Sequence, residues 1–490
     1  MRSDVIVIGA GPTGLVLAAE LRLGGAEVLV VERLPEPTRQ SRGLGFTARA
    51  MEAFDQRGLL PRFGEIETSP QGHFGGVRFD YTVLDGAHFG ARGIPQSQVE
   101  QVLADWAVER GARLRRGWEV VALDDDGASV ELTCDTPEGP RKVTAAYAVG
   151  CDGGRSTVRR LAGFAFPGTP ATRTMYLADV AGLAVRPRPL GERNPRGMVM
   201  AAPLGDGLDR IVVCPSKSPT ADADTGSAPR FEEVAAAWER ITGESLRGGS
   251  ATWASSFTDA TRQASEYRRG RVLLAGDAAH IHLPAGGQGM SLGILDAMNL
   301  GWKLAAVVRG DAPPMLLDTY HQERHPVAER VLELTRAQGT IFLGGEESEP
   351  LRTLLGELLE HDEVKRHLAG AVSGLDVRYH DPEETHPLVG RRLPPSPLRT
   401  DDGATSTAHL LRHGHAVVLN PTGSAAIRSA AEPWKDRVLT VTPMPVADTP
   451  PPATDTVLVR PDGHIAWAGT DPAGLASALT RWFGPRTHPR

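Results

Sequence analysis

The beginning of the chain alternates between apolar runs and a helix-like pattern. Residues 5–8 form a continuous apolar run, residues 9–14 contain three glycines, and residues 15–23 carry apolar side chains at helical spacing. A second apolar run follows at residues 28–31. Because glycines mark tight turns between such segments, the sequence predicts a strand, a turn, a helix and a second strand, which together form a βαβ unit.

A similar pattern returns much further along the chain. Residues 271–275 are typical of a buried strand, and a glycine-rich loop and a helical stretch over residues 292–308 come after them. We expect this segment to complete the first domain. Residues 320–326 indicate a helix that Pro326 breaks, and helical spacing continues towards Leu368.

Two other stretches have a different composition. Residues 72–93 are rich in glycine and aromatic side chains, and residues 171–262 mix short apolar runs with proline-rich interruptions. This mixture predicts a separate, sheet-rich domain. Beyond residue 379 prolines separate shorter elements, and residues 455–467 predict a hairpin that turns at residues 461–463. The sequence therefore predicts a small C-terminal α/β domain.

Composition and charge exclude several classes of protein. The 490 residues are 41% hydrophobic and 23% charged, which excludes a wholly disordered chain. With 53 Lys and Arg against 60 Asp and Glu, the formal charge is −7 and no basic block occurs, so nucleic acid is not an expected partner. The first apolar run is too short for a signal peptide or a membrane span, so we expect no membrane association.

The cysteine pattern indicates a reducing compartment. Cys134, Cys151 and Cys214 form no CxxC pair and no even-numbered disulfide framework, which favours the cytoplasm. No histidine or basic cluster flanks them, so we expect buried apolar side chains rather than nucleophiles.

The glycines of the first turn have the spacing of a dinucleotide-binding fingerprint. In Gly9-x-Gly11-x-x-Gly14, the first glycine makes the tight turn, the second lets a pyrophosphate approach the backbone, and the third allows close packing of helix on strand. The helix N-terminus offers free N–H donors to an anion. Glu32 ends the second strand, where its carboxylate can accept a hydrogen bond from a ribose hydroxyl. This pattern does not separate FAD from NAD.

Two later motifs favour FAD. Residues 150–157 place Asp152, two glycines and hydroxyl groups in a turn after an apolar strand. Residues 275–280 place Asp277 at the end of another strand, followed by a glycine loop that opens a helix. The acid can bind a ribityl hydroxyl, and backbone donors of the loop can stabilise negative charge at the N1/O2 edge of a reduced flavin.

With these three motifs in order, the chain resembles the FAD-dependent aromatic hydroxylases, which are group A flavoprotein monooxygenases of the p-hydroxybenzoate hydroxylase fold. Residues 151–155 resemble the DG motif of that family, and residues 276–280 resemble its GD motif. The resemblance covers essentially the whole chain and is strongest to the aromatic polyketide hydroxylases that act on angucycline-type rings, through residues 41–49, 72–76 and 280–289.

The resemblance implies a set of FAD contacts. Thr13 is expected at the phosphates, Glu32 at the adenosine ribose with Arg33 beside it, and the Val120 backbone at the adenine. Asp277 is expected at the ribityl and phosphate region. The full set expected to bind FAD is Gly9, Gly11, Thr13, Gly14, Glu32, Arg33, Arg42, Gln96, Val120, Asp152, Thr157, Asp277, Pro284, Gly287, Gly289, Met290 and Ser291.

One position departs from the family pattern. Many relatives carry Asn after Met290, whereas this chain has Ser291, which can present its backbone N–H but loses the longer amide contact. Arg42 is a candidate electrostatic helper at the flavin, and no general base is assigned. We expect the substrate to contact aromatic side chains of the middle domain, or else these side chains simply pack in a core: Phe74, Phe79, Tyr81 and Phe89.

The predicted fold class is α/β, as an α+β multidomain protein. A discontinuous, Rossmann-like FAD-binding domain is expected over residues 1–75, 95–170 and 265–380, and a sheet-rich substrate domain over residues 76–94 and 171–264. The resemblance implies a thioredoxin-like domain over residues 381–490, which lacks CxxC and so has no expected redox role.

The implied activity is an NAD(P)H-consuming monooxygenase that hydroxylates a polycyclic aromatic polyketide with O2 through a flavin C4a-hydroperoxide. NADPH or NADH is the transient reductant. Baeyer–Villiger insertion, oxidative inactivation of a rifamycin-type antibiotic and flavin binding without catalysis remain alternatives. Asp277, His280 and His282 could be read as an iron site, but the flavin motif already explains their loop, so no metal is expected. The pattern does not decide between a monomer and a homo-oligomer.

Overall fold

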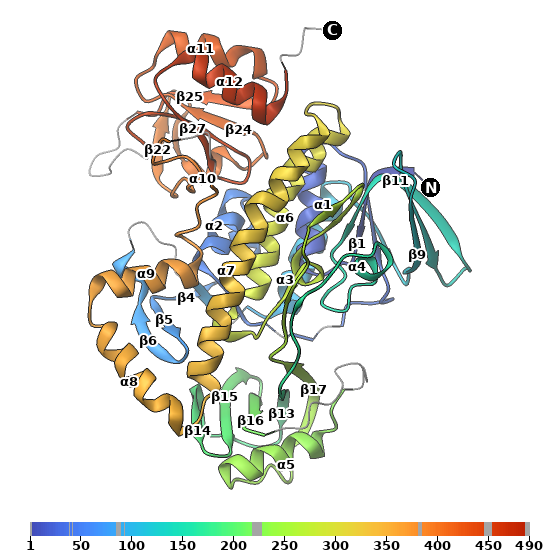
Figure 1. Ribbon diagram of the computed structural model, residues 1–490, viewed down its shortest axis with the longest axis vertical. Helices are drawn as coiled ribbons and strands as arrows, with labels where there is room; N and C mark the ends of the chain where they lie inside the picture. Colours follow the sequence, from blue (N-terminus) through green and yellow to red (C-terminus); the bar gives the residue numbers. More distant parts are fainter. Residues whose placement is uncertain are drawn as a thin grey trace.

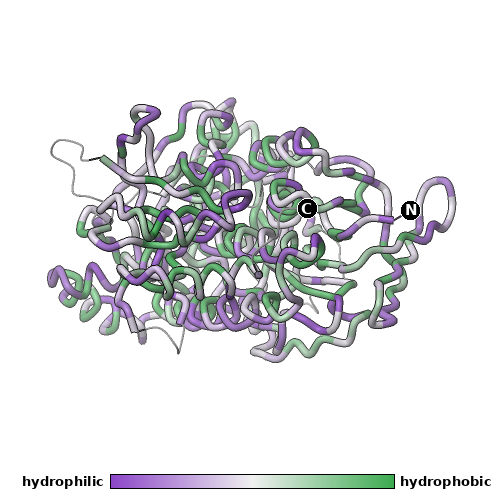
Figure 2. The backbone as a smooth tube through the Cα atoms, turned by 90° about the horizontal axis from the view of Figure 1, so that it is seen from above, coloured by the Kyte–Doolittle hydropathy of each residue, from purple (hydrophilic) through white to green (hydrophobic). Residues whose placement is uncertain are grey.

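The computed structural model describes residues 2–38, 40–41, 43–84, 90–92, 94–217, 228–380, 385–444 and 453–485. Figure 1 shows three regions along the long axis: a C-terminal domain at one end, a domain built on the first βαβ unit in the middle, and a second sheet at the other end. In Figure 2 apolar stretches run through the middle of the molecule, while many peripheral loops are hydrophilic. A mixed α/β, multidomain fold is confirmed.

The central domain is built on an eight-stranded sheet. Its main path has the order β19-β20-β11-β1-β2-β8, and β20, β11, β1, β2 and β8 run parallel. The strands are β1 (Arg2–Ile8), β2 (Val28–Glu32), β8 (Arg113–Arg116), β9 (Glu119–Asp125), β10 (Val130–Asp135), β11 (Arg141–Gly150), β19 (Arg268–Arg269) and β20 (Val272–Leu274). Parallel strands leave their carboxyl ends on one edge, so the three motifs that follow β1, β11 and β20 meet there.

Helices cover this sheet and extend from it. Helix α1 follows β1 and packs against α3 and α6, as the apolar spacing of its sequence requires. The helices are α1 (Pro12–Leu23), α2 (Ala48–Gln56), α3 (Gln96–Glu109), α4 (Thr157–Leu161), α6 (Gly289–Val308), α7 (Asp318–Leu343), α8 (Glu349–Leu358) and α9 (Asp362–Ser373). The segment 285–308 is long and apolar enough to cross a membrane, but 83% of its most apolar window is buried inside the protein, as a core helix requires.

The predicted break at Pro326 is wrong. Helix α7 runs without interruption through this proline, which lacks the N–H that would bond to the carbonyl of Gln322. Buried side chains on both sides, including Tyr320, Arg324 and Ala328, hold the helix against the rest of the domain. Tertiary packing therefore outweighs the loss of one backbone hydrogen bond.

One face of the second sheet packs on α5, and the other packs on the loop after the GD motif and on the C-terminal end of α7. The sheet has the order β14-β15-β16-β13-β17, all antiparallel. Its elements are β13 (Thr174–Ala181), β14 (Arg188–Asn194), β15 (Gly197–Gly205), β16 (Leu208–Pro215), β17 (Ser250–Thr258) and α5 (Phe231–Thr242). One face packs on Trp238 of α5, and a methionine-rich cluster on strands β13 and β15 packs on Leu283 and Phe342.

Short strands form three further small sheets. They are β3 (Gly45–Phe46), β4 (Glu67–Ser69), β7 (Gly90–Arg92), the hairpin β5 (Gln71–Phe74) and β6 (Val77–Asp80), and the set β12 (Gly168–Thr169), β18 (Thr261–Gln263) and β21 (His280–Ile281). The β5–β6 hairpin lies beside α8 and α9 (Figure 1).

The C-terminal domain has the arrangement of a thioredoxin-like fold. A four-stranded sheet has the order β25-β24-β26-β27, in which β24 and β25 are parallel and the other pairs are antiparallel. Its elements are β22 (Pro397–Thr400), β23 (Gly403–Ser406), α10 (Thr407–Leu410), β24 (Ala416–Leu419), α11 (Ala425–Ala431), β25 (Val438–Val441), β26 (Thr456–Val459), β27 (Ile465–Gly469) and α12 (Pro472–Phe483). The hairpin predicted over residues 455–467 is confirmed, and its second strand, β27, extends to Gly469.

The turn of this hairpin contacts the central domain through buried charged side chains. Arg460 donates to both carboxylate oxygens of Glu323 on α7, and Lys303 on α6 donates to the same carboxylate at 2.7 Å. Asn299 joins Glu323 to Asp462. Burial lowers the pKa of Lys303 to about 8. Burial also opposes ionisation of Glu323, but Arg460 and Lys303 outweigh it and hold its pKa at about 2.

A second buried pair connects α1 to the same turn. Arg57 donates to both carboxylate oxygens of Glu20 on α1, at 2.5 and 2.8 Å, and to the carbonyl oxygens of Leu411 and Pro461 in the C-terminal domain. Both charged side chains are only 1% exposed. One arginine therefore holds a fingerprint helix and the C-terminal domain together.

We expect Arg57→Ala to reduce the free energy of unfolding by about 3–5 kcal/mol, because the Glu20 carboxylate would stay buried without a counter-ion. Denaturant unfolding followed by circular dichroism measures this change. The matched control is Lys142→Ala, which breaks the exposed Lys142–Glu131 pair and should leave the unfolding midpoint nearly unchanged. Equal midpoints for both variants would contradict the importance of the Arg57 contact.

Candidate functional site

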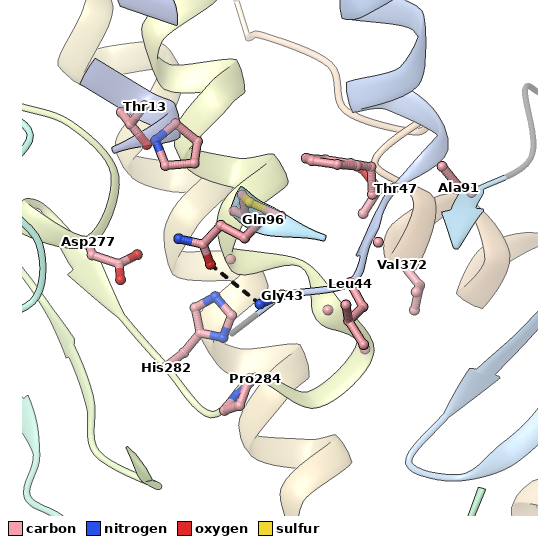
Figure 3. A pocket seen from close by; sticks show the side chains of 18 of the residues that line it. Thr13, Gly43, Leu44, Thr47, Ala91, Gln96, Asp277, His282, Pro284 and Val372 are labelled. Carbon is pink, nitrogen blue, oxygen red and sulfur yellow. Dashed lines mark hydrogen bonds between the residues drawn. The ribbon is translucent and has the colours of Figure 1, made fainter. Parts of the chain in front are cut away.

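A cavity of about 580 Å³ opens where the carboxyl ends of β1, β11 and β20 meet. All three sequence motifs contribute to its wall, together with the segment 43–47 and the β5–β6 hairpin. Its lining residues include Gly11, Pro12, Thr13, Gly43, Leu44, Thr47, Gly72, His73, Tyr81, Gln96, Cys151, Gly153, Asp277, His282, Pro284, Gly287, Gly289 and Met290. In Figure 3 Asp277 and His282 lie on one side of this space, and Leu44, Thr47 and Val372 lie on the other.

The three fingerprint glycines have different surroundings. Gly9 has φ +105°, and a Cβ there would overlap the Cys151 carbonyl at the end of β11. A Cβ on Gly14 would overlap the Gly9 carbonyl oxygen. A Cβ on Gly11 would meet nothing within 4 Å, although Gly11 lines the cavity. Gly9 and Gly14 are thus required by packing, while Gly11 leaves open space beside the N-terminus of α1, where an anionic group fits.

The carboxylate of Glu32 closes the turn that the fingerprint makes. It accepts hydrogen bonds from the backbone N–H of Ala10 at 2.8 Å and of Leu34 at 2.9 Å. Its oxygens retain further acceptor capacity for a ribose hydroxyl. Arg33 beside it is exposed, and Val120 on β9 is buried.

Asp152 of the DG motif caps a helix. Its carboxylate accepts from the backbone N–H of Thr157 at 2.7 Å and of Val158 at 3.1 Å, and from the Ser156 hydroxyl. Burial raises the pKa of Asp152. The lining of the cavity comes instead from its neighbours Cys151 and Gly153. The acid of this motif therefore shapes the turn, and the backbone of the turn faces the cavity.

The GD motif packs directly on the fingerprint helix. A Cβ on Gly276 would lie 2.7 Å from Thr13 Oγ1, and a Cβ on Gly293 of α6 would overlap the same hydroxyl. The next residue, Asp277, is exposed on the cavity wall. Two segments far apart in sequence thus present Thr13 and Asp277 to one space (Figure 3).

The glycine loop after the GD motif forms the floor of the cavity. Pro284, Gly287, Gly289 and Met290 all line it. Across from this loop, Gln96 Oε1 accepts a long hydrogen bond of 3.4 Å from the Gly43 N–H, and Gln96 Nε2 donates to Glu100 (Figure 3). The loop 284–290 and the opposite segment, residues 43–47, line the same part of the cavity, at the N-terminus of α6. We call this part of the cavity the slot.

The side chain of Ser291 does not face this slot. It is 1% exposed, and its Oγ accepts a hydrogen bond of 3.1 Å from the backbone N–H of Thr47. The hydroxyl therefore ties α6 to the segment before α2, while the backbone N–H of Ser291 lies in the first turn of the helix.

The predicted aromatic wall divides into two parts. Tyr81 lines the cavity and packs edge-to-face on Phe79, with ring centroids 5.1 Å apart. Phe74 and Phe79 are 5% and 4% exposed and pack in a core cluster with side chains of α7 and α9. Core packing accounts for those two rings. Phe89 and Arg42 lie outside the described residues.

Sequence reasoning named His282 only as a possible iron ligand, and it missed Asp296. His282 lines the cavity, and its Nδ1 donates to the Leu283 carbonyl at 2.7 Å, which leaves Nε2 as an acceptor. Burial lowers its pKa, so the ring is neutral. Asp296 lies on the apolar helix α6 and is fully buried. An acid in such a helix is a signal for a buried partner, because carboxylates are rarely buried unpaired.

The three cysteines lack the surroundings of a nucleophile. Burial raises the pKa of the Cys134 thiol to about 11 and of the Cys214 thiol to about 12, and it raises that of Cys151 well above its usual range. Protonated thiols are poor nucleophiles. Within the described ranges no group of three His, Cys, Asp or Glu side chains is placed to hold a metal ion.

Comparisons with known proteins agree with this geometry. Residues 2–335 match the family model described as FAD binding domain, and residues 386–486 match the model described as aromatic-ring hydroxylase, C-terminal. The chain is 46% identical to the 12-dehydrotetracycline 5-monooxygenase/anhydrotetracycline 6-monooxygenase of Streptomyces rimosus, over 99% of each chain. It is 43% identical to the rifampicin monooxygenase of Streptomyces venezuelae, again over 99% of each.

A solved structure is similar along the whole length. CabE, an aromatic hydroxylase from angucycline biosynthesis, shares 55% identity and a TM-score of 0.94, covering 99% of this chain and 100% of its own. The cavity also fits the cofactor, because Gly11 leaves room for a pyrophosphate and Asp277 presents a free edge to a polyol. The chain therefore belongs to the FAD-dependent aromatic-ring hydroxylases, and FAD is its cofactor.

Proposed function

We propose that this protein hydroxylates a phenolic ring of a polycyclic aromatic polyketide, with NAD(P)H as reductant and O2 as oxidant. One observation carries the proposal: a single cavity joins the FAD motifs to the wall made by the β5–β6 hairpin. The names of the similar proteins support the substrate class, since one is a monooxygenase of 12-dehydrotetracycline and anhydrotetracycline and another is an aromatic hydroxylase from angucycline biosynthesis.

We propose a division of labour along the chain that follows the predicted domain boundaries. The discontinuous domain over residues 1–75, 95–170 and 265–380 holds FAD, and residues 76–94 and 171–264 form the substrate side. The thioredoxin-like domain over residues 381–490 has no cysteine and acts by packing. A cytoplasmic location stays a prediction.

The proposed FAD contacts run from the end of β2, outside the cavity, along the cavity wall. Gly11 and Thr13 hold the pyrophosphate at the N-terminus of α1, and Glu32 with Arg33 holds the adenosine ribose. Asp277 binds a hydroxyl of the ribityl chain. The flavin ring lies between the glycine loop and the segment 43–47, a placement supported by the lining residues Gln96, Pro284, Gly287, Gly289 and Met290 and by the backbone N–H of Ser291 in the first turn of α6.

The substrate ring occupies the part of the cavity lined by the β5–β6 hairpin. Gly72 packs against two rings, since a Cβ there would be 2.7 Å from Phe79 and 2.8 Å from Tyr81, so no side chain projects from the hairpin at this point. A wall made of backbone and the Tyr81 ring suits a planar aromatic guest. Phe74 and Phe79 support this wall from behind.

When bound, FAD supplies the hydride acceptance and oxygen activation that side chains cannot provide. The residues of this chain orient the ring and exclude water from it. Neutral His282 adds an acceptor at Nε2, which has no hydrogen-bond partner in the described part of the chain. Its burial keeps a positive charge out of the cavity wall.

The rifampicin monooxygenase relative favours a second candidate function, oxidative inactivation of an aromatic antibiotic. Both functions, and Baeyer–Villiger insertion, use the same oxygen chemistry. The decisive test is aerobic turnover of the purified yellow protein with NADPH or NADH, ¹⁸O2 and a panel of tetracyclic phenols and ansamycins, followed by mass spectrometry.

We expect one ¹⁸O atom per product molecule and NAD(P)H oxidation that the phenol stimulates. The mass of the product and its fragments distinguish ring hydroxylation from ring insertion. Flavin absorbance without NAD(P)H consumption by any substrate would contradict monooxygenation and favour a flavin-binding protein without catalysis.

A glycine substitution tests the place of the pyrophosphate. Because a Cβ on Gly11 meets no protein atom, we expect Gly11→Ala to leave the melting temperature of the FAD-free protein unchanged. The added methyl group would occupy the space of the pyrophosphate, so FAD affinity should fall at least about tenfold, or 1.4 kcal/mol. Titration with flavin fluorescence measures it. Gly356→Ala on α8, where a Cβ likewise meets nothing within 4 Å, should leave FAD affinity unchanged.

The acid of the GD motif provides an independent test. We expect Asp277→Ala to weaken FAD binding about tenfold, because a hydrogen bond from a ribityl hydroxyl to a carboxylate contributes roughly 1.5–3 kcal/mol. Asp277 is exposed, so the fold should be unaffected. Full flavin occupancy of this variant after dialysis, measured by absorbance, would contradict the proposed contact between Asp277 and the ribityl chain.

A further inference from the structure

We propose that Asp296 is a positioning residue that fixes the GD loop, residues 276–280, in the shape that FAD binding requires. It lies on α6, 19 positions after Asp277, and touches neither the cavity nor the proposed cofactor site directly. The inference rests on the proposed contact between Asp277 and FAD, and it assigns the placement of that contact to a residue outside the cavity.

The Asp296 carboxylate holds the GD loop at both ends. Its Oδ2 accepts a hydrogen bond from the backbone N–H of Gly276 at 3.1 Å and from His280 Nε2 at 2.7 Å. Asp277 lies between these two residues, in the single turn Gly276–Ala278. One carboxylate oxygen therefore fixes the two anchor points on either side of the exposed acid.

A buried arginine keeps this carboxylate charged and oriented. Arg324 of α7 donates from Nε to Asp296 Oδ1 at 2.7 Å, and both side chains are 1% exposed or less. Burial opposes ionisation of Asp296, but the charge of Arg324 outweighs it and lowers its pKa. With Oδ1 held by Arg324, Oδ2 has a fixed direction towards the loop. The ionised carboxylate is the stronger acceptor for both loop donors.

The same arginine extends the contact chain beyond the central domain. Arg324 also donates to the Leu292 carbonyl at 3.2 Å and to the Tyr379 hydroxyl at 3.3 Å. Tyr379 stacks on His464 of the C-terminal hairpin turn, with ring centroids 4.1 Å apart. The segment that leads into the C-terminal domain is thus two hydrogen bonds away from the carboxylate that fixes the GD loop.

A neighbouring network on the same two helices provides a matched comparison. Glu323 precedes Arg324 on α7 and is 7% exposed, and it pairs with Lys303 of α6 and with Arg460. None of its recorded contacts involves the GD loop. Both networks are buried between α6 and α7, but only the network of Asp296 makes hydrogen bonds to the GD loop. Positioning of FAD is therefore expected to depend on Asp296 and not on Glu323.

The test compares FAD dissociation constants of Asp296→Asn and Glu323→Gln, measured by flavin fluorescence on the full chain well below both melting temperatures. We expect Asp296→Asn to raise the dissociation constant about tenfold and to change the visible circular dichroism of bound FAD. Glu323→Gln should lower the melting temperature while the dissociation constant stays within about twofold of the parent value. Parent-like affinity and spectrum for Asp296→Asn would overturn the proposal.

A second pair keeps the test decisive if Asp296→Asn fails to fold. In His280→Gln the amide can still donate to Asp296, whereas His280→Leu removes that donor. We expect weakened FAD binding in His280→Leu and recovery in His280→Gln, and equal affinity of both with the parent would overturn the inference. If Asp277→Ala also binds FAD normally, the proposed cofactor contact is wrong. If only Asp277→Ala weakens binding, that contact stands and the positioning role falls.

Discussion

The close contact between the N-terminus of α1 and the GD motif is the constraint on which the rest of the site depends. Thr13 fits between Gly276 and Gly293, and Gly9 fits against the Cys151 carbonyl, at separations that a Cβ would not allow. Only because these positions lack side chains do three strand ends come close enough to share one cavity. Backbone donors and the exposed acid Asp277 then face the same space.

Buried charge is the second organising feature. The central domain and the C-terminal domain meet through Glu20–Arg57 and Glu323–Arg460, which lie among apolar side chains. Removing such groups from water costs several kcal/mol per ion, and the cost is offset only when every group has a partner in the right direction. This interface therefore selects one relative orientation of the two domains, whereas an apolar contact would permit sliding.

Local patterns predicted much of the fold. The first βαβ unit, the strand before the GD motif and the C-terminal hairpin all depend on neighbours in sequence, and the structure has each of them. The site was harder. The sequence predicts that Asp152 faces a ligand, yet its carboxylate accepts a hydrogen bond from the first turn of α4. The Ser291 hydroxyl accepts a hydrogen bond from the Thr47 N–H. Such outcomes depend on which distant donor lies nearest, and no spacing rule encodes that.

The same limit applies to Pro326 and Asp296. A proline predicts a break, but helix α7 continues because buried side chains before and after it are held by other elements. Asp296 stands alone in an apolar stretch, so the sequence indicates that a partner exists without saying which one. Arg324 and His280 supply it from 28 and 16 residues away.

The position of the docking turn has a consequence for how the chain is made. Arg460 of this turn pairs with Glu323 of α7 and follows it by 137 residues, so it is synthesised after both α6 and α7. Until that turn is made, Glu323 has Lys303 and Asn299 as partners and lacks Arg460. The C-terminal domain therefore docks on the central domain after the helices next to the FAD-binding loops have been made, and a chain that stopped before Arg460 would leave Glu323 with one of its two cationic partners.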